Sequence, residues 1–172
     1  MRKILTLVII ATLTLGYSSL NAQNYKFGHI NSQELLNAMP DKDSAEAKIK
    51  KYAESLQEQI EQLQVEFNKK YQDYLQKRNT FTDAIREMKE KELSDMQQRA
   101  QEYQQVAEQD YQRFQAETMK PVIDKADAAI KKVAKENGFT YIFDTSSGVL
   151  LYFSDKSIDI TPLVKKELGI KE

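Results

Sequence analysis

Two long amphipathic segments, separated by one turn signal, constrain this chain more than any other feature of its sequence. In both, apolar residues recur every three or four positions among Glu, Gln and Lys, which predicts helices with narrow apolar seams. The first seam is Ile49, Tyr52, Leu56, Ile60, Leu63 and Phe67. The second seam is Met96, Ala100, Tyr103, Ala107, Tyr111 and Phe114. The intervals of the second seam reverse those of the first, so the two seams can face each other.

The segment 79–83 interrupts the pattern and carries the turn signal. Thr82 is expected to cap the second helix, with Asp83 favourable in its first turn. If the chain reverses here, every apolar seam residue meets an apolar partner, from Ile49 opposite Phe114 to Phe67 opposite Met96. The sequence therefore predicts an antiparallel coiled-coil hairpin, called here the arm (residues 43–119), in which each helix is about 55 Å long.

Short elements precede and follow the arm. On the N-terminal side we expect a strand over 25–31 and a helix over 33–38 that is capped by Ser32. A proline bends or breaks a helix and disfavours helical backbone in the residue before it. We therefore expect the joint between the arm and the rest of the chain at Pro40 and Pro121.

The C-terminal side predicts a helix over 122–136, ended by Asn137-Gly138. Strands are expected over 139–144 and 149–153, paired as a β-hairpin. A last helix, capped by Thr161, is expected to run to Leu168.

These elements predict a mostly helical α+β protein, in which a small body, made from residues 23–42 and 120–172, carries the arm. A sheet of three short strands is marginal alone, and self-association would cover its edges and apolar side chains. The expected body and oligomer core is Phe27, Ile30, Tyr141, Phe143, Leu151 and Phe153.

The first 22 residues have the order of a cleaved signal peptide. Arg2 and Lys3 precede an uncharged apolar run over 4–15, and small or polar residues follow. The run is shorter than the roughly 20 residues that span a membrane. We expect a secreted protein; an uncleaved N-terminal anchor is the alternative.

Composition excludes several classes of function. The chain has no Cys, so disulfides and thiolate metal sites are ruled out, and its net charge of −1 includes no concentrated basic face for nucleic acid. It shows no Ser/His/Asp set, phosphate-binding glycine loop or metal-ligand spacing. The single histidine, His29, is interpreted as structural. We therefore expect no enzyme activity and no cofactor.

Short motifs across the chain resemble the Skp/OmpH family of periplasmic outer-membrane-protein chaperones. They lie at 27–32, 35–36, 120–123, 129–139, 142–144, 150–152 and 159–161. The resemblance implies a homotrimer whose strands form a β-barrel body and whose three arms surround a cavity. Unfolded outer-membrane proteins would be held in that cavity without ATP, in the periplasm. The alternative is a periplasmic coiled-coil scaffold that binds one folded partner.

Charge and aromatic placement refine the expected partners. The range 43–117 contains 12 Lys/Arg against 16 Asp/Glu, which argues against contact with anionic lipid or lipopolysaccharide. Tyr71, Tyr74 and Phe81 find no apolar partner in the predicted hairpin. Partly apolar, adaptable surfaces suit promiscuous binding, so these three residues are the candidate client contacts.

Overall fold

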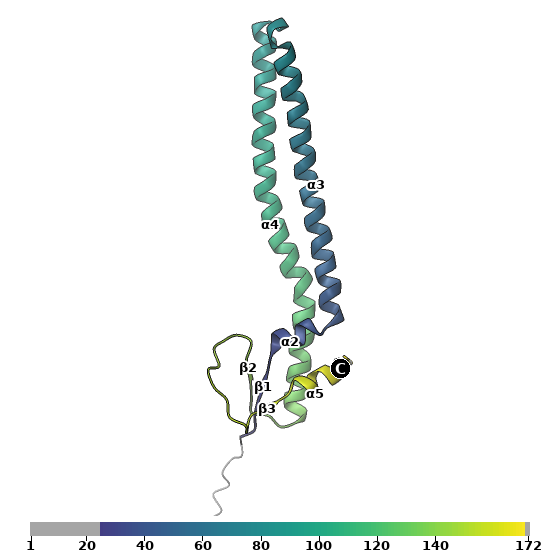
Figure 1. Cartoon of the computed structure of the whole chain (residues 1–172), viewed down its shortest axis with the longest axis vertical. Coiled ribbons are helices and arrows are strands. Elements are labelled where there is room, and N and C mark those ends of the chain that lie inside the picture. Colours follow the sequence, from purple (N-terminus) through teal and green to yellow (C-terminus); the bar gives the residue numbers. More distant parts are fainter. Residues whose placement is uncertain (1–24, 171–172) are drawn as a thin grey trace, which may run out of the picture.

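A computed structural model describes residues 25–170, and the predicted signal peptide lies outside them. In chain order the elements are β1 (Phe27–Ile30), α2 (Ser32–Asn37), α3 (Pro40–Lys77), η1 (Arg78–Thr80), α4 (Asp83–Glu136), β2 (Tyr141–Asp144), β3 (Ile158–Asp159) and α5 (Thr161–Glu167). Figure 1 shows α3 and α4 standing side by side on a small body. Within the described range, no helix has the length and apolar character needed to cross a membrane.

The long helices begin at residues suited to a helix start. Pro40 is the first residue of α3, three positions before the predicted start, because a proline there lacks only an N–H that the helix does not use. The Thr82 hydroxyl accepts a hydrogen bond from the Ile85 N–H at 3.4 Å, which confirms the predicted cap of α4. The chain reverses direction between the two helices at η1 (Figure 1).

Aromatic packing in the seam is offset from the predicted pairing. Tyr52 stacks on Phe114 with ring centroids 4.2 Å apart, whereas the seams had opposed Phe114 to Ile49. Helical side chains lean toward the N-terminus of their own helix. Because the two helices run in opposite directions, the two rings lean toward each other along the arm and meet.

The expected interruption at Pro121 is absent, since α4 continues through this residue to Glu136. Proline's fixed φ suits a helix, and only one intrahelical hydrogen bond is lost. The next turns are also held by packing, because Val122 and Ala126 are buried in the body core. The predicted end of this helix is confirmed, with Gly138 following at φ 68°.

The sheet has the order β2-β1-β3, and both neighbours run parallel to β1. The predicted strand over 149–153 and its β-hairpin are therefore wrong. After β2 the chain crosses to the opposite edge of β1, where the Ile160 N–H donates to the His29 carbonyl at 2.9 Å. This crossing allows Ile160 and Val164 to be fully buried, which a hairpin on the β2 edge would not provide.

Two predicted helix caps are also corrected. The Asn31 side chain, rather than Ser32, caps α2 by accepting from the Glu34 N–H at 3.0 Å. At α5 the Asp159 carboxylate accepts a hydrogen bond from the Thr161 N–H at 2.8 Å. Asp159 therefore caps the start of this helix, and the predicted capping residue, Thr161, is the hydrogen-bond donor.

The core lies in the body, where β1, α2, α4 and α5 meet. Its most buried side chains are Ile30, Leu35, Met39, Ile160 and Val164. Gly28 makes part of this packing possible, because a Cβ there would lie 2.8 Å from Ile142 and 2.9 Å from Phe139. A side chain at this position would force the Ile142 and Phe139 side chains to shift.

Candidate functional site

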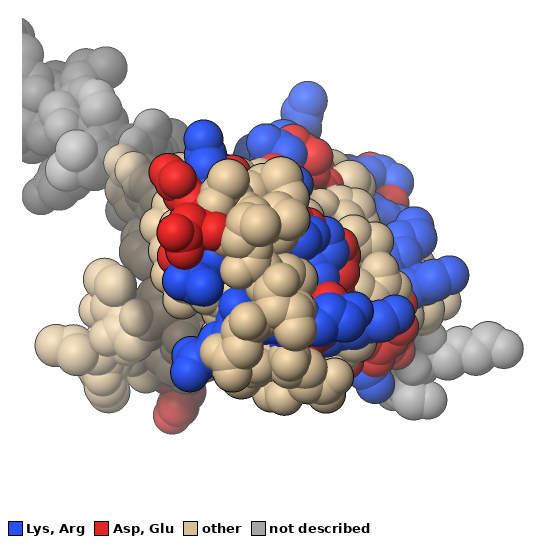
Figure 2. Space-filling model, turned by 90° about the horizontal axis from the view of Figure 1, so that it is seen from above, with Lys and Arg blue, Asp and Glu red and all other residues tan. Residues whose placement is uncertain are grey.

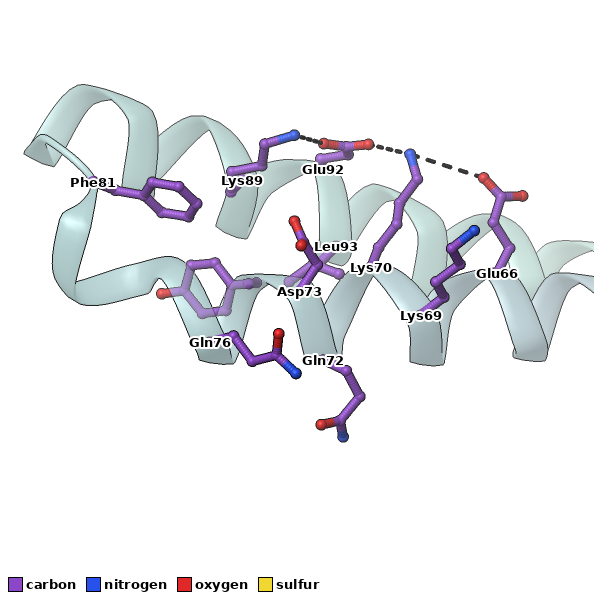
Figure 3. A pocket seen from close by; sticks show the side chains of 11 residues that line it. Glu66, Lys69, Lys70, Gln72, Asp73, Gln76, Phe81, Lys89, Glu92 and Leu93 are labelled. Atoms are coloured by element: carbon purple, nitrogen blue, oxygen red, sulfur yellow. Dashed lines mark hydrogen bonds and ion pairs between the residues drawn. The ribbon is translucent and has the colours of Figure 1, made fainter.

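A groove of about 650 Å³ opens between α3 and α4 near the end of the arm, and is called here the distal groove. Figure 3 shows its lining, with aromatic rings close to η1 and charged side chains farther from it. The lining consists of Glu66, Lys69, Lys70, Gln72, Asp73, Tyr74, Gln76, Phe81, Lys89, Glu92 and Leu93.

The aromatic wall of the distal groove is formed by Tyr74 and Phe81. Their ring centroids are 6.3 Å apart and the rings are tilted by 36°. The Tyr74 hydroxyl donates a hydrogen bond to the Glu90 carboxylate, which joins α3 to α4 and raises the pKa of Tyr74. The wall is therefore held in place before any ligand arrives.

Ion pairs connect the helices beside this wall. The Glu92 carboxylate accepts from the ammonium groups of Lys70 and Lys89, the latter at 2.9 Å (Figure 3). The hydrogen bond from Lys70, followed by that from Lys89, lowers the pKa of Glu92 to about 2. The Lys70 ammonium also lies 3.8 Å from Glu66. Glu92 therefore stays ionised at neutral pH and holds two lysines against the helices.

The structure separates the three candidate client contacts. Tyr74 and Phe81 line the distal groove, whereas Tyr71 lies outside it and stacks on Phe67 with centroids 5.9 Å apart. The prediction that none of the three has an apolar neighbour within the arm is therefore wrong. Tyr71 nevertheless remains 41% exposed.

Sequence reasoning missed the lysines of the distal groove, because it averaged charge over the whole arm. Residues 69–91 contain seven Lys/Arg and four Asp/Glu, whereas 43–68 and 92–117 together contain five and twelve. Figure 2, viewed from the side of the arm's end, shows Lys and Arg side chains interspersed with Asp and Glu on this face. A charge count by segment would have revealed this basic end.

The body presents an apolar face that no other residue within 25–170 covers. Phe27 stacks on Tyr141 at 6.2 Å and lies 6.4 Å from Phe143, and all three rings are exposed. Leu151 is 94% exposed, in the segment between β2 and β3. Ile30, also predicted for this set, is only 2% exposed and belongs to the chain's own core.

His29 occupies a structural setting. Its Nδ1 lies 2.9 Å from the Ser157 hydroxyl, and its ring centroid lies 4.2 Å from that of Phe153. These contacts attach the 145–157 segment to β1. Across residues 25–170, no three His, Cys, Asp or Glu side chains are grouped so that they could hold a metal ion.

Comparisons with known proteins agree with this architecture. The family model described as "Outer membrane protein (OmpH-like)" matches residues 26–168. A crystal structure of a proposed OmpH-like outer membrane chaperone from Caulobacter crescentus CB15 superposes with a TM-score of 0.73 at 12% identity, covering 84% of this chain and 83% of that one. No curated protein sequence matches significantly. Since the family match extends over nearly the whole sequence, this chain belongs to the OmpH-like family, the Skp/OmpH family that its motifs resemble.

Proposed function

We propose that this protein is an ATP-independent periplasmic holdase chaperone that binds unfolded outer-membrane proteins and prevents their aggregation. Membership of the OmpH-like family supports this, as does the likeness to the solved structure of a proposed OmpH-like outer membrane chaperone. The observation that carries the proposal is a small body from which a long helical arm extends (Figure 1), with aromatic side chains on the body left exposed by the other described residues.

The working unit in this proposal is a homotrimer with a barrel-like body. The exposed rings of Phe27, Tyr141 and Phe143 and the exposed Leu151 form an apolar surface of the kind that marks protein interfaces. The free edges of β2 and β3 offer unpaired backbone groups for a neighbouring strand. Contact between neighbouring subunits of the trimer would cover both the apolar surface and the free strand edges.

In the trimer, three arms, each made of two antiparallel helices, enclose a client between them. Their surfaces are mostly Glu, Gln and Lys, with scattered apolar side chains such as Val65 and Val106 left exposed. Many weak contacts of this kind hold a chain through multivalency rather than through one pocket. Tyr71, Tyr74 and Phe81 are the proposed client contacts.

The same proposal assigns the chain to functional units. Residues 1–22 are a cleaved signal peptide, 23–42 and 120–172 form the oligomerising body, and 43–119 form the arm. The arm flexes at its base, near Pro40 and Pro121, which lets the cavity adjust to clients of different size.

The test dilutes a urea-unfolded outer-membrane β-barrel protein into buffer with and without this protein, in the absence of nucleotide. Light scattering reports aggregation. We expect suppression near one trimer per client. A helical, oligomeric preparation that gives no suppression at any ratio would contradict the proposal and favour the scaffold that binds a folded partner.

A further inference from the structure

The distal groove has the size and wall chemistry of a binding site. Its volume of about 650 Å³ falls within the range of about 300–1,000 Å³ that is typical of ligand pockets. Tyr74, Phe81 and Leu93 supply the apolar part of its lining, with Phe81 at the end nearest η1 (Figure 3). Aromatic rings pair well with further rings in tilted or offset arrangements, so this end suits an aromatic side chain.

The aromatic wall is preorganised. The hydrogen bond from Tyr74 to Glu90 fixes one ring, and the second ring lies against the first just after η1. A ligand that enters therefore does not have to order these side chains first. Avoiding that entropy cost raises affinity.

The charges at the groove favour an acidic residue next to the aromatic side chain of a bound ligand. Lys70 and Lys89 are paired with Glu92, and Asp73 is paired with Lys77 at 2.5 Å. Among the described charged residues that line the groove, Lys69 alone has no ion pair. The surrounding basic end of the arm adds to its positive potential.

We propose that the distal groove binds one aromatic side chain of an extended polypeptide segment, with an adjacent Asp or Glu paired to Lys69. This inference rests on the proposed function, because the segment belongs to an unfolded client. The groove gives each arm one preferred contact in addition to the weak contacts along its length.

Fluorescence anisotropy with a labelled peptide tests the inference. The probe is fluorescein-Gly-Ser-Asp-Phe-Asp-Ser-Gly, compared with one peptide carrying Ala for Phe and another carrying Lys for both Asp. We expect the purified protein to bind the first peptide at least about fivefold more tightly than the Ala peptide. The Lys peptide should also bind more weakly than the first.

Three variants locate the contact. Phe81→Ser should weaken binding of the first peptide about fivefold, the scale of an aromatic pair. Lys69→Glu should weaken it similarly and should strengthen binding of the Lys peptide. Met88→Ser removes an exposed apolar residue near the end of the arm but outside the groove lining, and serves as the control, with unchanged affinity expected. Circular dichroism should show unchanged helix content in all three.

Several outcomes would overturn the inference. Equal losses in Phe81→Ser and Met88→Ser would mean that the arm binds aromatic residues through its exposed apolar side chains without using the groove. Phe81-dependent binding to phosphatidylglycerol vesicles with no peptide binding would assign the groove to a membrane surface. Self-association lost in Phe81→Ser, again without peptide binding, would assign it to a second copy of the chain.

The light-scattering assay separates this inference from the proposed function. Suppression of aggregation without peptide binding would overturn the groove and leave the holdase function standing. Peptide binding with the expected variant effects, but without suppression, would support the groove as a polypeptide site and contradict the holdase function.

Discussion

The body and the arm distribute their buried surface very differently. In the body, α2, α4, α5 and β1 converge on Leu35, Ile160 and Val164, none of which has measurable exposure. Beyond residue 46, the described part of the arm buries only Ile49, Met96 and Ala107, and these keep 5–7% of their surface exposed. Most seam residues stay half-exposed, because a two-helix ribbon has solvent on both sides.

This difference indicates where stability and adaptability lie. Regions with few buried apolar contacts open locally at low free energy. The arm's many ion pairs are solvated, and such pairs each contribute little. The body therefore anchors the molecule, and the arm tolerates surface changes, which suits a surface that meets many sequences.

The largest expected effect comes from the apolar surface of the body. Leu151→Asp should abolish the proposed trimer, weakening association more than about 100-fold, because burying an unpaired carboxylate is costly. The subunit itself should remain folded, since Leu151 is 94% exposed within its own chain. Analytical ultracentrifugation measures the oligomer.

Val65→Asp is the matched control for this change in the arm. Val65 is 67% exposed on α3, so the same substitution should leave the oligomer unchanged. If the trimer dissociates in both variants, or in neither, the proposed distinction between an interface on the body and a solvated arm is wrong.

The second prediction compares cavities in the two regions. Leu35→Ala in the body core should lower the free energy of unfolding by about 3 kcal/mol, the usual cost of such a cavity. Leu75→Ala near the end of the arm should cost less than about 1 kcal/mol, because Leu75 is exposed. Urea denaturation followed by circular dichroism measures both. A larger loss at Leu75 would mean that the arm is the cooperative core.

The arm was the more predictable region because its information is local. The intervals between Ile49 and Phe67, and the turn signal at Thr82, specify helices and their reversal without reference to the rest of the fold. The same locality explains the missed groove. The opposed pairs were chosen by polarity alone, so the reach of Tyr74 to Glu90 and of Lys70 to Glu92 was not visible.

The body was less predictable because its strands pair through distant residues. The run at 149–153 has the composition of a strand, yet strand preference depends on neighbours that pack against it. The actual third strand, Ile158–Asp159, is two residues long and is determined by the burial of Ile160. No local pattern distinguishes these two outcomes.

Pro121 tests where the rigid body ends and the arm begins. Pro121→Ala restores one N–H that can hydrogen-bond within α4, which stabilises the folded protein. It also removes the restriction that proline places on the unfolded chain, which acts in the opposite direction. We expect a net increase of about 1 kcal/mol in the free energy of unfolding. Small-angle scattering should show a narrower spread of arm positions. Pro162→Ala is the control, because Pro162 lies in the first turn of α5, outside the arm and its joint. An unchanged spread in Pro121→Ala would contradict a flexible joint there.

The smallest effect concerns the ion pairs that hold the distal groove. Glu92 has a pKa lowered from 4.5 to about 2 by Lys70 and Lys89, so ionised Glu92 stabilises the folded arm. That contribution is complete above the pKa of the unfolded chain and disappears as the pH falls through about 2. Glu92→Gln should therefore be less stable than the natural protein at pH 7, and the difference should shrink steadily below pH 4.5. Urea titrations at several pH values measure this difference, and Glu87→Gln, on an exposed carboxylate of the same helix without an ion pair among the described residues, is the control. A difference that does not change with pH would mean that Glu92 acts through packing, in which case the lysines beside the groove would not depend on its charge.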